Sequence, residues 1–430
     1  MIVEFSVKNF RSIKDLQTLS FVASKLDSNN TKYPDVDKRN IVDIDDLRLL
    51  KTVGIYGANA SGKSNVIRAF EYFSKAISDL PSPESRLSNV ADPFIYQDNY
   101  LSQESFFQII AIINNKKYRY GFTVKRNKSA ENEKGSKEII TNEWLFGPKE
   151  KNQTNYFTRK GQKLENLNLP EQANIPEIPY QHSLFLTHAA SFSKGVCETI
   201  RYHIAGFLVF NYSLGLDYYR FQSIRYLQDN STKGDFLNLL SSFSLNYDDI
   251  TIEKEDEPQK SLQVPRNKIY LSKKVIGFET SPRLNLQYTE SEGTKKMFDL
   301  AGLLMAAFRS RVGGIIVLDE LDSNFHPSLV IKLVQLFNNL EINKSNFQLL
   351  FTSHDTNLLS PAIMRRDQIY FAEKTIYEDT RLYSLSDLKG IRNDGDFAKQ
   401  YLAGFYGALP VLENLVEKNK ADEESLGIKG

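Results

Sequence analysis

The string GANASGKS at residues 57–64 constrains the fold of this chain more than any other feature. It follows TVGIYG, which has the apolar character of a buried strand, and it precedes NVIRAFEYF, which has the spacing of an amphipathic helix. In this context the pattern G-x-x-x-x-G-K-[ST] predicts a loop whose N–H groups face phosphate oxygens at a helix N-terminus. Lys63 would reach the β- and γ-phosphates of ATP, and the Ser64 hydroxyl would bind Mg²⁺. The predicted ATP-binding residues of the loop are Gly57, Ala58, Asn59, Ala60, Ser61, Gly62, Lys63 and Ser64.

Two adjacent acids at the end of a second apolar strand complement this loop. The strand GIIVL is followed directly by Asp319 and Glu320. Such a pair can be the solvated start of a loop, but next to a phosphate-binding loop it has a chemical role. We predict that Asp319 enters the Mg²⁺ shell and that Glu320 orients or deprotonates the attacking water.

A histidine ends the next apolar strand, QLLFTSH. A neutral imidazole at this place could donate a hydrogen bond to the γ-phosphate and sense its hydrolysis. His354 is therefore predicted as a second catalytic residue, although a lone histidine is more often a packed one.

A second anion site is predicted at the start of the amphipathic helix TKKMFDLAGLLMAAF. Ser291, Glu292 and Gly293 precede this helix, and a serine, a glycine and a helix N-terminus together can bind an anion. This string cannot easily cap a nucleotide held by its own chain if both sites lie on one face at a distance. It can cap the nucleotide of a second copy, so we expect a homodimer or a higher homo-oligomer.

The order of patterns divides the chain into four predicted regions. Residues 1–125 begin with alternating strands, continue into the phosphate-binding loop and include a hairpin over 106–124. Residues 126–285 are polar and irregular and are predicted to be an insertion of helices and loops. Residues 286–375 return to an α/β pattern, and residues 376–430 form a C-terminal extension. A run of cations in the hairpin is either a solvated face or a nucleic-acid contact: Lys116, Lys117, Arg119, Lys125, Arg126 and Lys128.

Composition excludes several classes of protein. Of the 430 residues 41% are apolar and 25% are charged, so the chain can bury a sizeable core. The net charge of +1 gives no global preference for nucleic acid or for a membrane surface. Cys197 is the single cysteine, and no apolar run approaches the ~20 residues of a membrane span. Because the start has no signal-peptide pattern, we expect a cytoplasmic protein without a membrane partner.

These strings together resemble the ABC/SMC/RecF-like ATPases. The chain has G-x-N-x-S-G-K-S-N at 57–65, S-E-G-T at 291–294, V-L-D-E-L-D at 317–322 and S-H-D at 353–355. They resemble the Walker A, signature, Walker B with D-loop, and H-loop motifs of that group. The resemblance implies an ABC-ATPase-like α/β head: a mixed sheet around a P-loop helix plus an antiparallel β subdomain, with a helical or irregular insertion. It also adds Asn65 to the ATP-binding residues.

Three further roles follow only from the resemblance. The opening Asn-Phe-Arg-Ser string would bring Arg11 to the nucleotide phosphates, although this string can also be a surface turn. Asp322 would cross the dimer seam and join Ser291, Glu292 and Gly293 in binding ATP in trans. The glutamine loop of these ATPases has no clear counterpart, and Gln97 is the best candidate for this third metal-binding position.

A narrower resemblance concerns the strings N-F-H-P at 324–327, R-R-D-Q-I at 365–369 and Y-L-A-G-F-Y-G-A-L-P at 401–410. They are similar to the AAA15/AAA21 type, within it to the RloA/AbiLi/AriA group of phage-defence ATPases, which are commonly encoded beside a TOPRIM-like nuclease. Phe325 departs from the leucine that is usual there. The resemblance implies an ATPase that senses a phage-derived trigger and controls a nuclease effector in trans. A RecF-like ATPase acting on DNA is the alternative.

Overall fold

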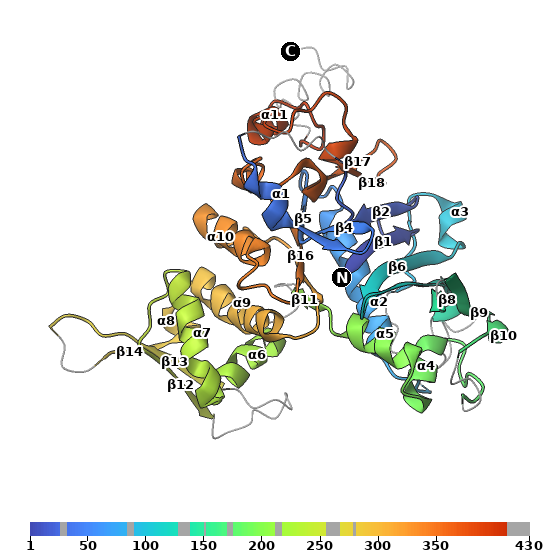
Figure 1. Ribbon diagram of the computed structural model, residues 1–430, viewed down its shortest axis with the longest axis horizontal. Helices are drawn as coiled ribbons and strands as arrows, with labels where there is room; N and C mark the ends of the chain where they lie inside the picture. Colours follow the sequence, from blue (N-terminus) through green and yellow to red (C-terminus); the bar gives the residue numbers. More distant parts are fainter. Residues whose placement is uncertain are drawn as a thin grey trace, which may run out of the picture.

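Two large sheets enclose helix α2 (Lys63–Ser78), which follows the phosphate-binding loop (Figure 1). The computed structural model describes residues 1–25, 32–83, 90–127, 138–149, 152–169, 175–210, 217–254, 267–277 and 281–410. On one side of α2, Phe70 packs against Phe5 with tilted rings whose centroids are 3.9 Å apart, and Phe73 lies parallel to Phe122. On its other side the same apolar core includes Val53 of the second sheet.

The first sheet is antiparallel and has seven strands. Their order is β10 (Lys163–Leu167), β9 (Asn152–Lys160), β8 (Glu138–Lys149), β7 (Lys116–Arg126), β6 (Ser105–Ile113), β1 (Ile2–Lys8) and β2 (Gln17–Ser20). Alternate residues of β6 and β7 enter the core that contains α2, in the two-residue period of an antiparallel sheet with one buried face.

The second sheet is mixed and carries the candidate catalytic residues at strand ends. Its order is β11 (Leu208–Phe210), β15 (Ile315–Leu318), β16 (Gln348–Thr352), β5 (Thr52–Tyr56), β17 (Ile369–Lys374) and β18 (Thr380–Ser384). The first five strands are parallel, and β18 runs antiparallel to β17. Strands β15, β16 and β5 are buried along their whole length because both faces of the sheet are covered.

Helices cover the face of the mixed sheet that α2 does not. A second apolar core joins β15 and β16 to α9 (Glu292–Arg309), α10 (Pro327–Asn338) and α11 (Phe397–Leu402). Figure 1 shows that α9 leads into a separate lobe at the lower left. Its other elements are α6 (Asp217–Gln228), α7 (Asn230–Ser242), α8 (Leu286–Thr289) and the three-stranded sheet β12 (Asp249–Lys254), β13 (Asn267–Ser272) and β14 (Arg283–Asn285).

Small elements complete the described chain. A two-stranded sheet, β3 (Ile41–Ile44) with β4 (Leu47–Leu50), follows α1 (Asp35–Asn40), while α3 (Asp98–Leu101) precedes β6. Helices α4 (Phe185–Phe192) and α5 (Val196–Ala205) lie beside the seven-stranded sheet and α2. Short 3₁₀ turns occupy Thr356–Leu358, Arg366–Gln368 and Leu385–Asp387. No described helix is long and apolar enough to cross a membrane.

The prediction of a mixed α/β fold is confirmed, but residues 126–285 differ from the helical and irregular insertion that we expected. Strands β8, β9 and β10 lie within this range and extend the seven-stranded sheet, and β11 joins the mixed sheet. The strand pattern was hidden because core-facing positions hold charges. Glu143 and Arg159 are fully buried and form an ion pair of 3.2 Å. Ionised residues inside a sheet break the apolar alternation on which strand prediction depends.

The region boundaries also fall inside structural units. The boundary at 285/286 separates β14 from α8, which belong to one lobe, and the boundary at 375/376 separates β17 from its neighbour β18. Lys128 and residues 411–430 of the predicted C-terminal extension lie outside the described residues.

Candidate active site

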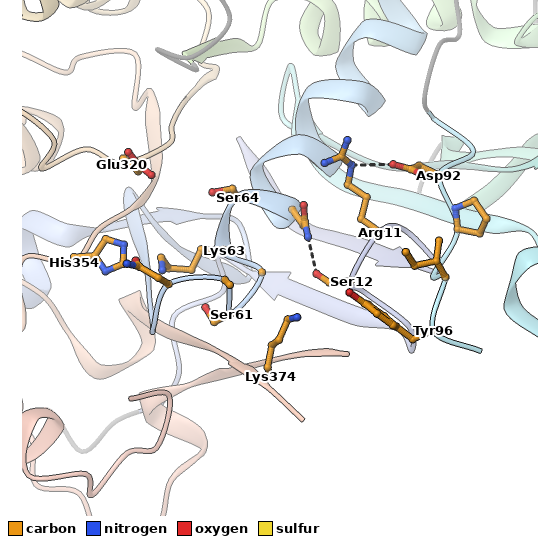
Figure 2. A pocket seen from close by; sticks show the side chains of 16 residues that line it. Arg11, Ser12, Ser61, Lys63, Ser64, Asp92, Tyr96, Glu320, His354 and Lys374 are labelled. Atoms are coloured by element: carbon orange, nitrogen blue, oxygen red, sulfur yellow. Dashed lines mark hydrogen bonds and ion pairs between the residues drawn. The ribbon is translucent and has the colours of Figure 1, made fainter. Parts of the chain in front are cut away.

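A pocket of about 510 Å³ opens where β5, β15 and β16 end. Its size suits a nucleotide. Figure 2 shows Glu320 and His354 at one end, Arg11, Asp92 and Tyr96 at the other, and Lys63 and Ser64 between them. The lining residues are Arg11, Ser12, Asn59, Ala60, Ser61, Gly62, Lys63, Ser64, Asn65, Asp92, Pro93, Ile95, Tyr96, Glu320, His354 and Lys374.

The phosphate-binding loop is fixed by contacts from distant parts of the chain. Gly62 has φ of 103°, and a Cβ there would lie 1.9 Å from Thr380 Oγ1, so both conformation and space require glycine. The Thr380 hydroxyl donates to the carbonyl of Ser61 at 2.9 Å and lies 2.7 Å from Ser12 Oγ. Asn65 Nδ2 donates to the same Ser12 hydroxyl at 2.7 Å.

The C-terminal part of the chain reaches the loop as well. The Ala58 N–H donates to the carbonyl of Ala408 at 2.9 Å. Tyr401 donates its hydroxyl to that same carbonyl at 3.2 Å, and Tyr401 stacks on Phe371 of β17. The segment recognised in the sequence only by resemblance thus supports the first turn of the loop.

Lys63 is folded back onto its own loop. Its Nζ donates to the carbonyls of Gly57 at 2.9 Å and Ala58 at 2.8 Å. Burial lowers the pKa of Lys63, while the nearby carboxylates act in the opposite direction. Among the described residues no hydrogen-bond partner reaches the buried Ser61 Oγ. A buried cation and an unsatisfied hydroxyl in one loop fit a phosphate group, which would accept from both.

The two acids and Ser64 meet around one threonine. Asp319 Oδ1 accepts from Ser64 Oγ at 3.2 Å and from Thr352 Oγ1 at 2.6 Å. The Thr352 hydroxyl in turn accepts from the Glu320 N–H at 2.7 Å, and it is buried at the end of β16. Ser64 and Asp319 are therefore adjacent, and their oxygens are of the kind that Mg²⁺ prefers. Glu320 has φ of 50°, a strained conformation for a non-glycine residue that the Thr352 hydroxyl holds in place.

His354 lies on the pocket next to this group. Burial and the charge of Lys63 lower its pKa, so the ring is neutral at pH 7. Its backbone N–H donates to both carboxylate oxygens of Asp322 at 3.2 Å. Asp322, predicted to act in trans, thus also links the loop after β15 to the loop after β16 in its own chain.

Arg11 reaches the pocket from the N-terminal loop. It has φ of 53°, and its Nε forms an ion pair of 3.1 Å with Asp92 Oδ2. Arg126, at the end of β7, binds the other oxygen of Asp92 at 3.2 Å. Arg11 therefore lines the pocket, as predicted. Its side chain is oriented by Asp92, which also binds Arg126 of the seven-stranded sheet.

The predicted second anion site lies elsewhere. Ser291, Glu292 and Gly293 do not line the pocket of their own chain. Ser291 caps α9, its Oγ accepting from the Thr294 N–H at 3.2 Å, and a Cβ on Gly293 would lie 2.5 Å from the carbonyl of Asn324. The same helix contributes the buried Lys296, whose Nζ donates to the carbonyls of Glu320 and Ser323, both at 2.8 Å. The start of α9 is thereby attached to the chain that follows Glu320.

Gln97 is not among the residues that line the pocket, whereas its neighbours Ile95 and Tyr96 are. Its role as a metal ligand stays a prediction. Strand β11 ends at Phe210, which is paired with Leu318, the residue before Asp319. The residues that follow, 211–216, lie outside the described part of the chain.

Sequence reasoning missed several residues of this site. Tyr96 and Ile95 are exposed at the pocket, where an aromatic face could stack on a base, and Lys374 Nζ lies 5.9 Å from the Tyr96 ring centroid. Ser12, Asp92, Thr352 and Thr380 were missed too. The one available signal was that Thr352 lies near the end of the predicted strand QLLFTSH.

Comparison with known proteins agrees with this geometry. The family described as "AAA domain, putative AbiEii toxin, Type IV TA system" matches residues 53–360, which is more than two thirds of the chain. This range includes the phosphate-binding loop, Ser291–Gly293, Asp319, Glu320 and His354. A comparison with curated proteins gave no match. The chain thus belongs to the AAA-domain family described as putative AbiEii toxin, type IV TA system, and is a P-loop ATPase of this type.

Proposed function

We propose that the protein is a Mg²⁺-dependent ATPase whose two nucleotide sites form between two copies of the chain. One observation carries the proposal: the pocket contains the phosphate-binding loop and both catalytic candidates, whereas Ser291 and Gly293 lie outside it. In this proposal Ser291, Glu292, Gly293 and Asp322 of one copy close over ATP bound by the other. At its Ser291 end, helix α9 offers the helix N-terminus to an anion, and the Ser291 hydroxyl would have to turn from the Thr294 N–H toward the phosphates.

The side chains of the pocket divide the chemistry between them. Lys63 would leave the carbonyls of Gly57 and Ala58 and donate to phosphate oxygens, with Ser61 and Arg11 adding further donors. Ser64 and Asp319 would hold Mg²⁺, which neutralises charge on the phosphates when bound. Glu320 would accept a proton from the attacking water, and neutral His354 would donate to the γ-phosphate.

Hydrolysis would be transmitted through the loops after β15 and β16. Asp322 binds the His354 N–H, and Lys296 of α9 binds the carbonyl of Glu320. A movement of His354 or Glu320 on loss of the γ-phosphate would therefore displace Asp322 at the dimer interface and the start of α9. Such loss of γ-phosphate contacts is the usual way in which P-loop proteins switch state.

We further propose that this cycle controls a separate effector in an anti-phage system. Two observations support this: the C-terminal strings resemble phage-defence ATPases, and the description of the matching family names a putative AbiEii toxin of a type IV toxin–antitoxin system. After β18, Ala408 and Tyr401 support the phosphate-binding loop. A TOPRIM-like nuclease encoded nearby would be held in one nucleotide state and released on recognition of a phage-derived trigger.

The test is affinity purification of Glu320→Gln protein, expressed with its native flanking genes, in ATP and Mg²⁺. We expect a stoichiometric neighbour-encoded protein to co-purify and to leave when the trigger is supplied. Lys63→Ala protein, which should bind ATP poorly, is the matched control. Recovery of the same protein in equal amount with both variants would contradict nucleotide control, and recovery of no protein would contradict an effector in trans.

The alternative function, a RecF-like ATPase acting on DNA, predicts a different result. DNA would then accelerate ATP hydrolysis, and salt would suppress this effect because phosphate contacts release counterions. An ATPase rate that does not respond to DNA would contradict this alternative.

A further inference from the structure

The seven-stranded sheet has an outer face that the nucleotide site does not use. Tyr118, Tyr120, Phe122 and Val124 of β7 point into the core with α2. The intervening residues Lys117, Arg119, Gly121, Thr123 and Lys125 therefore point outward. The strand register continues these outward positions across the neighbours of β7.

An indole ring forms the centre of this face. Trp144 of β8 is paired with Gly121, and a Cβ on Gly121 would lie only 2.5 Å from the ring. The indole can lie across β7 because Gly121 has no side chain. It stacks on Phe106 of β6, with centroids 5.4 Å apart and planes at 27°, and Nε1 donates to Gln108 Oε1 at 3.2 Å. Trp144 and Phe106 are only half-buried, so part of this aromatic surface faces solvent.

Cations surround the aromatic surface. Arg119 is paired with Phe146 of β8, and its guanidinium lies 4.3 Å from the centroid of that ring. Lys117 and Arg119 are exposed, and Lys125, three outward positions beyond Arg119 on β7, is half-buried. On β9, Lys160 is exposed and lies opposite Asn142 of β8. Aromatic side chains of β6 and β8 thus alternate with basic side chains of β7 and β9 over four adjacent strands.

The outer face is bounded by a hairpin that covers one end of it and by two acidic residues. Near β1 the face is closed by an apolar cluster of Val3, Leu49 and Ile112, into which the β3–β4 hairpin packs. Glu4 is half-buried next to that closed end, opposite Ile110. Glu104, also half-buried, accepts from Asn142 Nδ2 at 3.3 Å. The open part, from Phe106 to Lys160, has more basic than acidic side chains among the described residues.

We propose that this outer face binds a single strand of nucleic acid. Flat aromatic rings offer stacking surfaces to unpaired bases of any sequence, and interleaved cations attract the phosphodiester backbone. In a duplex, both faces of each base stack on the neighbouring base pairs. The phosphates of a duplex could therefore contact the cations, but its bases could not stack on Trp144. An apolar protein partner fits less well, because Lys117, Arg119 and Lys160 would have to be desolvated without carboxylates. The face is separate from the pocket and needs no nucleotide for binding.

The test is fluorescence anisotropy of the full-length protein with labelled oligo(dT) of about 15 nucleotides, a length that spans such a face. Oligo(U) of equal length distinguishes RNA from DNA, and duplex DNA of equal length is the third probe. Trp144→Ala should weaken binding of the preferred single strand about 5- to 150-fold, the range expected for losing one stacked base. The double change Lys117→Gln with Arg119→Gln should weaken binding and lower the slope of log affinity against log salt by about 1.4.

A matched control carries the same loss of charge elsewhere. Lys38→Gln with Arg392→Gln removes two exposed cations outside the sheet and should leave the affinity within about twofold. Unchanged circular dichroism and melting temperature would show that Trp144→Ala still folds. The proposal is overturned if neither single strand binds, if duplex DNA binds more tightly than both, or if the control weakens binding as much as the Lys117 and Arg119 variant. The proposal is also overturned if Trp144→Ala binds the oligonucleotide normally but no longer co-purifies with a protein that the wild type retains.

Discussion

Replacing Thr352 by valine should separate catalysis from nucleotide binding. Valine has nearly the shape of threonine, so the buried end of β16 keeps its packing, but the hydroxyl is lost. That hydroxyl makes two bonds: it donates to the Asp319 carboxylate at 2.6 Å and accepts from the Glu320 N–H at 2.7 Å. Lys63 makes its hydrogen bonds to the carbonyls of Gly57 and Ala58, so the loop should bind ATP as before.

The magnitude follows from these two bonds. A hydrogen bond to a charged group contributes about 1.5–3 kcal/mol and a neutral one about 0.5–1.5 kcal/mol. The hydrogen bond from the Glu320 N–H is the one that should affect catalysis, because it holds Glu320, whose φ is 50°, in position. If losing this contact costs 1–2 kcal/mol of transition-state stabilisation, kcat falls about 5- to 30-fold. The bond to Asp319 should appear as a higher Mg²⁺ requirement.

Steady-state phosphate release gives kcat, and a fluorescent ATP analogue gives the affinity. Thr352→Ser is the control because it keeps the hydroxyl, and it should retain most of kcat. The reasoning is refuted if Thr352→Val hydrolyses ATP at the wild-type rate, or if serine is as damaging as valine. A large loss of nucleotide affinity in Thr352→Val would equally show that the threonine supports the loop and not the acids.

Four further predictions concern groups around the site. Because its pKa is lowered by burial and by Lys63, His354 should give an acidic limb of the pH–rate profile below that of an ordinary histidine, and His354→Gln should remove this limb. Lys296→Met should lower the free energy of unfolding by about 1–3 kcal/mol in denaturant titrations, since two backbone carbonyls lose a buried donor, while ATP still binds the monomer. Tyr96→Ala should weaken ATP several-fold but leave inhibition by inorganic tripolyphosphate unchanged, which competition assays can show. Burial raises the pKa of Glu138 from 4.5 to about 7. Between these two pH values Glu138 is protonated in the folded state and ionised in the unfolded state, so the free energy of unfolding falls as the pH rises through this window. Glu138→Gln should therefore raise the melting temperature at pH 8, where the cost of ionisation reaches about 3 kcal/mol, and should not raise it at pH 5.

Much of the mixed sheet could be predicted from sequence because its signals are local. The strand before the loop, the strand ending in Asp319 and the strand ending in His354 are short apolar runs followed by polar residues, and each is present as β5, β15 and β16. The antiparallel start and the hairpin over 106–124 are also confirmed, as β1 with β2 and β6 with β7. Their outward and inward residues alternate clearly, as strands with one buried face do.

The rest depends on contacts between residues far apart in the chain. Glu143 looks like a surface residue until Arg159, Tyr120 and the N–H groups at the start of α4 surround it. Thr352 has no sequence signature of its own, and its role appears only when β16 lies beside β15. Thr380 supports Gly62 from a position more than 300 residues away. No periodicity or motif within one segment can reveal such pairs.

The central claim is that two copies of the chain enclose ATP, and sedimentation of Glu320→Gln protein tests it most directly. The account predicts a monomer without nucleotide or with ADP, and a dimer with ATP and Mg²⁺. Ser291→Arg, added to the same variant, should abolish the dimer while the monomer still binds ATP, because Ser291 lies outside its own pocket. A mass that does not change with ATP, or a Ser291→Arg monomer that has lost ATP, would contradict the account.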